Sequence, residues 1–141
     1  MKLAYPIYIA KNGSDYLVYV PDMDIYTEGK NAAEAMSMAR DAISGKSLVY
    51  EEEGRKLPEP SDYDKAHALT VKQADGEDFS YSKGICTLVD IDLDEYRKKM
   101  ENRSVKKNCT IPYQLSVEAD KAGINYSRVL QNALREELHM G

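Results

Sequence analysis

The sequence predicts an α+β protein in two parts: a small antiparallel sheet with one main helix, followed by a shorter strand–helix–helix unit. Three observations support this class. Several short segments alternate apolar and polar residues, which is typical of strands. One longer segment has apolar residues at three- and four-residue steps, which indicates a helix. After residue 103, a further alternating segment precedes a proline and two helical segments.

The chain begins with a predicted β-hairpin. Residues 5–10 and 15–20 are rich in β-branched and aromatic side chains, and Lys11-Asn-Gly-Ser14 between them has strong turn chemistry. Pro21 ends the second strand, and residues 25–27 predict a short third strand.

The main helix is predicted to begin at Asn31, because Asn31 and Glu34 have the spacing of a capping box. Gly54 is its expected stop, and residues 55–61, with two prolines, predict an extended connector. The apolar stripe of this helix consists mostly of small side chains that would let it lie close to a sheet: Ala32, Ala35, Met36, Ala39, Ala42 and Ile43.

The rest of the first part contains one segment without a clear secondary-structure pattern and one clearly predicted strand. Residues 62–83 show little periodicity, with a short strand conceivable at 69–71 and a turn at 75–78. Residues 94–101 indicate a short charged helix or a linker. Between these segments, a clean alternation predicts the last strand of the sheet: Ile85, Thr87, Val89, Ile91 and Leu93.

We therefore expect a first domain over residues 1–97, a linker over 98–103 and a second domain over 104–141. The charge changes sign near this boundary, because residues 1–96 hold 10 Lys and Arg against 19 Asp and Glu, whereas residues 97–141 hold 9 against 5. A basic segment fits contact with nucleic acid. The acidic part favours a basic partner, although a merely solvated surface explains it equally well.

Composition excludes several classes of protein. No apolar run approaches the ~20 residues that a membrane helix needs, and the first residues run into a strand rather than a signal peptide. We therefore expect a cytoplasmic protein with no membrane partner. Cys86 and Cys109 lie far apart with no second pair, which favours neither a zinc site nor a disulfide scaffold.

The pattern of the second part predicts a strand and two helices. Residues 104–111 alternate, Pro112 suits the first turn of a helix, and Gly123 suits its end. Asn125 or Ser127 would cap the last helix, whose apolar residues are Tyr126, Val129, Leu130, Ala133, Leu134 and Leu138. So small a unit buries too little apolar surface to fold alone. We expect it to dimerise by pairing its strand with that of a second copy.

Residues 106–112 and 122–130 together resemble the ribbon-helix-helix DNA-binding family, which includes the Arc and MetJ repressors. In that family the strand side chains two, four and six positions before the proline read bases, which implies Thr110, Asn108 and Lys106 here. The resemblance and the free amides of a helix start together imply a phosphate-binding set: Lys107, Asn125, Tyr126, Ser127 and Arg128. The alternative is an ordinary capped helix pair attached to a larger domain.

Residues 15–23, 27–35, 39–42 and 57–61, in this order, resemble the HicB family of antitoxins. The resemblance implies a partial RNase H-like sheet, often with a DNA-binding tail, and a small basic mRNA-cleaving toxin, HicA, as partner. The chain departs from the family at Pro21-Asp-Met-Asp-Ile-Tyr26, where members usually have Pro-Asp-Leu-Pro-Gly-Cys.

Five residues of the first domain are candidates for toxin binding, because tyrosines are enriched at interfaces and acidic groups favour a basic partner: Tyr16, Tyr19, Asp22, Asp24 and Glu28. The simpler interpretation of the tyrosines is that they are ordinary strand residues.

The sequence offers little for catalysis. A metal-dependent nuclease would need converging carboxylates, and nothing holds the candidates Asp15, Asp22, Asp24 and Glu28 in one pocket. No triad partner or phosphate loop accompanies the two histidines. We therefore expect no catalytic residues, no metal, no cofactor and no enzyme activity.

The main hypothesis is a type II antitoxin that inhibits a HicA-like toxin and represses its own operon by binding double-stranded operator DNA. It would form a homodimer through the ribbon-helix-helix domain, with a tetramer left open. The alternative is a stand-alone ligand-responsive ribbon-helix-helix repressor.

Overall fold

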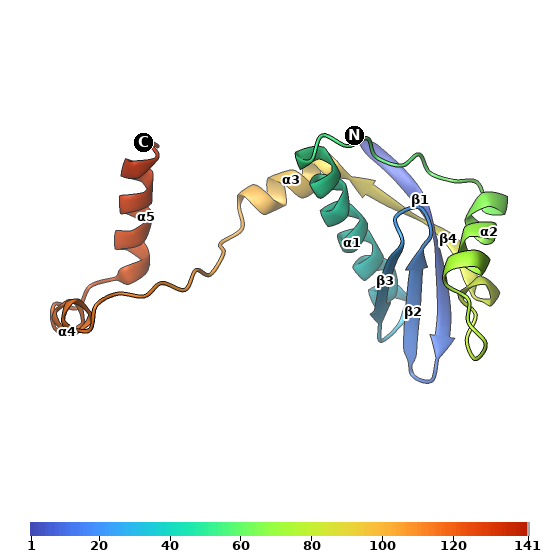
Figure 1. Cartoon of the computed structure of the whole chain (residues 1–141), viewed down its shortest axis with the longest axis horizontal. Helices are drawn as coiled ribbons and strands as arrows, with labels where there is room; N and C mark the ends of the chain where they lie inside the picture. The colour runs from blue at the N-terminus through green and yellow to red at the C-terminus, as the bar shows by residue number, and fades with distance from the viewer. Residues whose placement is uncertain (141) are drawn as a thin grey trace. The chain divides into compact units, whose positions relative to one another are not determined.

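The computed structural model describes residues 1–140, in which the chain forms two compact units (Figure 1). The first unit spans Met1–Arg103, and the second begins at Ser104. Helix α3 (Leu93–Glu101) belongs to the first unit. Residues 98–101, which we expected to be linker, are therefore helical.

Four antiparallel strands form the sheet of the first unit: β1 (Lys2–Asn12), β2 (Asp15–Val20), β3 (Ile25–Gly29) and β4 (Ile85–Asp92). Their order is β3-β2-β1-β4, so β3 and β4 are the edges. The predicted hairpin, short third strand and last strand are confirmed, and so is the α+β class. Gly13 makes the hairpin turn with φ +63°, a left-handed conformation that glycine adopts without strain.

Helix α1 (Ala32–Glu52) packs on one face of the sheet (Figure 1). Asn31 caps it as predicted, because its Oδ1 accepts a hydrogen bond from the Glu34 amide at 2.8 Å. Of the expected stripe, Ala35, Ala39 and Ile43 are fully buried, whereas Ala32 is exposed. The strand side chains of this core are mostly large and apolar: Tyr5, Ile7, Ile9, Val18, Val20, Val89 and Ile91.

Helix α2 (Tyr63–Gln73) lies on the opposite side of the sheet from α1 (Figure 1). The strand expected at residues 69–71 is therefore wrong, and the first unit has more than the one main helix predicted. Asp62 caps α2 by accepting the Lys65 amide at 2.9 Å. Its buried residues, Ala66 and Thr70, lie one turn apart. Residues Tyr81–Lys83 then form the short helix η1 before β4.

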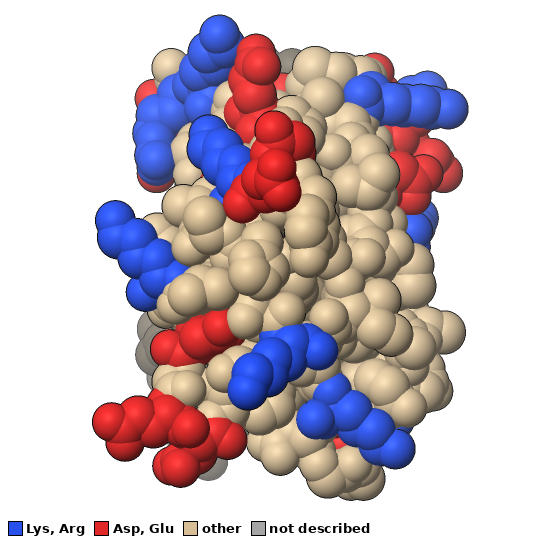
Figure 2. Space-filling view, turned by 90° about the vertical axis from the view of Figure 1, so that its right-hand side faces the viewer, with Lys and Arg blue, Asp and Glu red and all other residues tan. Residues whose placement is uncertain are grey.

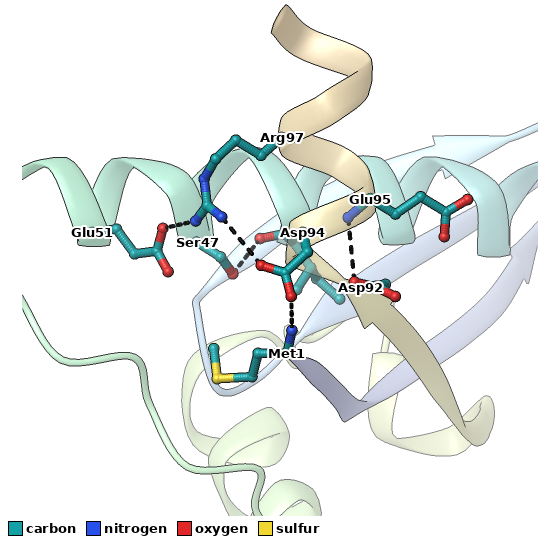
Figure 3. Close-up of polar contacts among 8 residues, drawn as sticks. Met1, Ser47, Glu51, Asp92, Asp94, Glu95 and Arg97 are labelled. Atoms are coloured by element: carbon teal, nitrogen blue, oxygen red, sulfur yellow. Dashed lines mark hydrogen bonds and ion pairs between the residues drawn. The ribbon is translucent and has the colours of Figure 1, made fainter.

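Helix α3 continues directly from β4 and is attached to α1 by charged groups (Figure 3). Arg97 forms ion pairs with Glu51 of α1 and with Asp94, and Asp94 also accepts from the amino group of Met1. These contacts hold the pKa of Asp94 below its usual range, with the hydrogen bond from the amino group as the largest cause. Because the charged side chains of these ion pairs are exposed to solvent, added salt should weaken the ion pairs.

The second unit contains helices α4 (Tyr113–Lys121) and α5 (Tyr126–Glu137). Pro112 precedes α4, and its carbonyl accepts the Ser116 amide at 3.0 Å. Gly123 follows α4 with φ +65°, as expected for a helix stop. Of the two predicted caps for α5, Asn125 is the one used. Across residues 1–140, no helix is long and apolar enough to span a membrane.

Candidate functional site

The predicted base-reading residues lie in the segment that leads into α4. Lys106, Asn108 and Thr110 are exposed, and residues 103–112 form neither a helix nor a paired strand within the described chain. A strand that pairs only with a second copy has no partner inside one chain. The expected strand over 104–111, and the reading role of its side chains, therefore stay predictions. The neighbouring Lys107 is exposed as well.

The start of α5 has the chemistry of an anion site. The Asn125 side chain accepts the Arg128 amide at 3.1 Å, and the Asn125 carbonyl accepts the Val129 amide at 3.1 Å. The amides of Tyr126 and Ser127 belong to the first turn, which has no helical acceptor for them. Together with the helix dipole they would attract a phosphate oxygen.

One acidic group stands close to this helix start. The Tyr126 hydroxyl donates to the carboxylate of Asp120 at the end of α4, and this hydrogen bond raises the pKa of Tyr126. The contact links α4 to the first turn of α5. It also fixes the Tyr126 side chain on α4, so we expect the backbone amide of Tyr126, rather than its hydroxyl, to be the group available to phosphate.

The helices of the second unit carry apolar side chains that one copy leaves uncovered. Neither α4 nor α5, both fully described, has a buried residue. Apolar side chains exposed together on two helices indicate an association surface. Its members on and around the two helices are Ile111, Leu115, Ile124, Tyr126, Val129, Leu130, Leu134 and Leu138.

In the first unit, the residues predicted to bind a toxin differ in accessibility. Asp24 and Glu28 are exposed. Tyr19 is fully buried, with its hydroxyl 2.8 Å from Asp24 Oδ1 and 2.7 Å from Gln73 Oε1 of α2. Burial raises the pKa of Tyr19, followed by the effect of Asp24. In this conformation Tyr19 is a structural residue and offers no surface to a partner.

Two other predicted residues also have structural contacts. The Asp22 carboxylate accepts from the Ser61 amide at 2.9 Å and from the Ser61 hydroxyl, which fastens the connector to the sheet. Tyr16 is half-buried and packs against the core. Only Asp24 and Glu28 of the predicted set therefore remain well placed to meet a partner.

The sequence interpretation missed an aromatic cluster on the same side of the sheet as α2. The Tyr26 ring lies 4.8 Å from the Tyr19 ring and 5.8 Å from the Tyr81 ring, and the Phe79 ring lies 5.0 Å from Tyr81. Tyr26 is about half exposed. Its position two residues before Glu28 in β3 would have placed these two side chains on one face of the strand.

A groove between α1 and α3 is a second feature that the sequence did not reveal. It has a volume of about 350 Å³ and is lined by charged and polar groups that include Arg40, Asp41, Tyr96, Lys99 and Arg103. Burial raises the pKa of Tyr96, with Asp41 as the next cause. Among residues 1–140, no cluster of three or more His, Cys, Asp or Glu has metal-binding geometry.

The comparisons with known proteins cover both units. The sequence matches the family model described as "HicB_like antitoxin of bacterial toxin-antitoxin system" over residues 5–133. A protein of Haemophilus phage HP1 (strain HP1c1), described as an uncharacterized 14.9 kDa protein in the rep-hol intergenic region, is 32% identical over 120 residues. That match covers 84% of this chain and 80% of the phage protein.

Two solved structures are similar. A chain of a toxin-antitoxin complex from Streptococcus pneumoniae aligns with a TM-score of 0.57 and 22% identity, covering 97% of this chain and 99% of that one. The antitoxin HicB of Burkholderia pseudomallei aligns with a TM-score of 0.49 and 24% identity, covering 99% and 98%. The first of these likenesses shows that the fold occurs in a toxin-antitoxin complex.

Proposed function

Because the chain belongs to the HicB-like antitoxin family of bacterial toxin-antitoxin systems, we propose that it binds and inhibits a HicA-like mRNA-cleaving toxin and represses its own operon. The observation that carries this proposal is the family match, which runs from residue 5 to residue 133 and so includes both units. The protein would act by binding alone, as an inhibitor and a repressor, without catalysing a reaction.

The first unit is the proposed toxin-binding part. It contains 20 Asp and Glu against 14 Lys and Arg, so a basic partner gains from long-range attraction. The exposed Glu28 lies on the same face of β3 as the half-exposed Tyr26, and the exposed Asp24 immediately precedes this strand. Tyr26 would supply apolar area beside the two carboxylates. This end of the sheet is where we place the toxin contact.

The second unit is the proposed DNA-binding part, in a ribbon-helix-helix arrangement. Two copies would cover the exposed apolar side chains of α4 and α5 and would pair residues 104–111 as a two-stranded ribbon. Lys106, Asn108 and Thr110 would then read bases in the major groove. Lys107, Arg128 and the amides at the start of α5 would hold phosphates.

The test is co-expression with the short basic reading frame expected next to this gene. If the proposal is right, the neighbour alone stops growth and the present chain restores it, while the purified chain retards a duplex carrying its own promoter. Failure of rescue by a well-expressed chain would refute toxin inhibition. Retention of promoter binding in that case would leave the second unit as a repressor module.

The groove between α1 and α3 favours one alternative, a stand-alone repressor whose first unit senses a small molecule. Its volume of about 350 Å³ and its mixture of cationic and anionic groups would suit a small polar ligand. Gene context separates the two functions, because a sensor needs no toxic neighbour. A harmless neighbouring product together with promoter binding that responds to a metabolite extract would support the alternative.

A further inference from the structure

Aromatic side chains meet at steep angles on the side of the sheet that α2 covers. Tyr26, on the edge strand β3, is 52% exposed, and its ring plane makes an angle of 71° with that of Tyr81. The ring of Phe79 lies edge-on to Tyr81, at an angle of 89°. Rings at such angles form the walls of a corner rather than a stack. The negative face of a π system is attractive to a cation.

The ring of Tyr26 is held from two directions. Its hydroxyl donates a hydrogen bond to the Gln73 carbonyl of α2 at 3.2 Å, and its ring packs on the buried Tyr19 ring. A side chain that is already fixed loses little conformational freedom when a partner covers it, which favours affinity.

Two carboxylates stand beside these rings. Glu28 lies on the same face of β3 as Tyr26 and contributes to the raised pKa of Tyr81, after burial and Tyr26. Asp24 contributes to the raised pKa of Tyr26, after burial. A carboxylate has this effect because it disfavours a second negative charge nearby. Both acidic groups therefore face the aromatic corner.

The carboxylate of Asp24 is fixed in position but keeps its charge unpaired. Its Oδ1 lies 2.8 Å from the hydroxyl of the buried Tyr19, and its backbone has a left-handed φ of +50°. Within residues 1–140, neither Asp24 nor Glu28 forms an ion pair with a lysine or arginine. Both negative charges are therefore available to a cation from outside the chain.

The cations of the chain that lie over tyrosine rings are at other places. Lys11 Nζ is 5.8 Å from the Tyr16 ring centroid, and the Arg55 guanidinium is 4.2 Å from that of Tyr50. Across the described part of the chain, residues 1–140, no lysine or arginine lies over the rings of the aromatic corner. The corner therefore has the chemistry of a cation site and no cation of its own.

Overall charge does not choose where a basic partner binds on the first unit. Figure 2 shows the side on which α2 lies, where acidic and basic side chains stand around a broad uncharged area. Long-range attraction brings a basic protein toward an acidic one, but local contacts fix its position. A small group of residues that recognises one cation would supply such a contact.

We propose that four residues form a receptor for one cationic side chain of the toxin, an arginine or a lysine: Tyr26, Tyr81, Asp24 and Glu28. This inference rests on the proposed toxin inhibition and names the chemical group that the first unit recognises. The cation lies against the ring faces while the carboxylates accept its N–H groups. A guanidinium suits both contacts, because it is planar and carries its donors around its edge.

The test measures the affinity of full-length variants for the toxin, which is the product of the neighbouring short basic reading frame. The toxin is co-expressed with the wild-type chain, separated in denaturant and refolded, and its binding is followed by biolayer interferometry. Tyr26→Leu keeps an apolar side chain but removes the aromatic face, and it should weaken binding about tenfold. Tyr63→Leu is the matched control, because Tyr63 of α2 is 60% exposed and lies outside the receptor. It should change affinity by less than about twofold.

A second pair of variants separates the local contact from the overall charge. Glu28→Gln and Glu52→Gln each remove one negative charge from an exposed position, and Glu52 ends α1, which packs on the other face of the sheet. Glu28→Gln should weaken binding about tenfold, whereas Glu52→Gln should weaken it by less than about twofold. Equal losses in the two variants would show that only net charge matters and would overturn the receptor.

Replacing the cationic residues of the toxin one at a time identifies the recognised side chain. One of these replacements should lose most of its effect when Tyr26 is already leucine, and full additivity at every position would contradict the proposal. Unchanged affinity in both Tyr26→Leu and Glu28→Gln would overturn the receptor and leave toxin inhibition standing. A wild-type chain that does not bind the toxin would overturn both. Thermal melts check folding, and if Tyr26→Leu unfolds, the comparison of the two glutamate variants decides.

Discussion

Replacing Gly29 with alanine should destabilise the first unit, because the backbone of β3 lies directly against the first turn of α1 there. A Cβ at position 29 would lie 2.4 Å from the Ala35 nitrogen and 2.8 Å from the Ala35 Cα. The obstacle is helix backbone, held by the hydrogen bond of 2.9 Å from the Ala35 amide to the Asn31 carbonyl. It cannot rotate away as a side chain would. Overpacking costs about 1–3 kcal/mol, and we expect the upper part of this range.

Gly45→Ala is a matched control with the opposite expected sign. It adds the same methyl group to the same unit, but its Cβ would meet only the Tyr96 hydroxyl at 3.5 Å, an ordinary contact. Gly45 lies inside α1, where alanine is favoured over glycine by about 0.5–1 kcal/mol. The two variants should therefore differ in free energy of unfolding by about 2–4 kcal/mol.

Urea unfolding, followed by the near-ultraviolet circular dichroism of the packed tyrosines, measures this difference. The urea concentration at the unfolding midpoint should fall for Gly29→Ala and rise for Gly45→Ala. The slope of the unfolding free energy against urea concentration should be unchanged in both variants. An unchanged midpoint for Gly29→Ala would show that α1 and β3 are further apart than the structure indicates. A changed slope would point to an altered unfolded state instead.

The other predictions concern DNA binding and pH. Asn108→Ala should weaken binding to the promoter duplex by about 1–3 kcal/mol in a gel-shift titration while leaving rescue from toxicity intact. Equal loss of DNA binding and rescue would contradict the assignment of DNA binding to the second unit and toxin binding to the first. Lys107→Ala should weaken binding to all DNA sequences alike and lower the slope of log affinity against log salt concentration by about 1. A loss of affinity confined to one DNA sequence would argue against a phosphate contact. Burial, and then Asp22, raise the pKa of Tyr5 to about 12, above the value of about 10 expected when unfolded. The stabilisation from neutral Tyr5 is complete below about pH 10 and is lost as the pH rises through about 12. Tyr5→Phe should therefore lose less stability than the wild type between about pH 10 and pH 12 in urea titrations, and parallel losses would refute this assignment.

The sheet and α1 were predictable because their signals are local. The alternation of β4 and the cap at Asn31 depend on neighbouring residues, and the structure retains both. Helix α2 was missed because its buried positions are only Ala66 and Thr70, which leave a weak apolar stripe, and because threonine and valine near its end suggest a strand. The Asp62 cap was the one local signal that could have identified it.

The missed helix α2 also explains why the sequence interpretation counted Tyr19 among the candidate toxin-binding residues. Alternation correctly separates the two faces of β2, but it does not tell which face a later segment covers. Without α2, the face that carries Tyr19 looks open to solvent. With α2 in place, Gln73 meets the Tyr19 hydroxyl and the residue is buried. Tyr26, on the edge strand beside it, donates to the Gln73 carbonyl of α2 at 3.2 Å but stays half exposed.

The basic charge near the C-terminus has a consequence for DNA binding. Four of its nine Lys and Arg residues belong to the first unit: Arg97, Lys98, Lys99 and Arg103. The second unit keeps 5 Lys and Arg against 4 Asp and Glu, so one copy has few cations to neutralise phosphates. Affinity for DNA grows steeply with the number of phosphate contacts. Pairing two copies would therefore meet two needs together, because it covers the apolar side of α4 and α5 and doubles the cations that face one duplex.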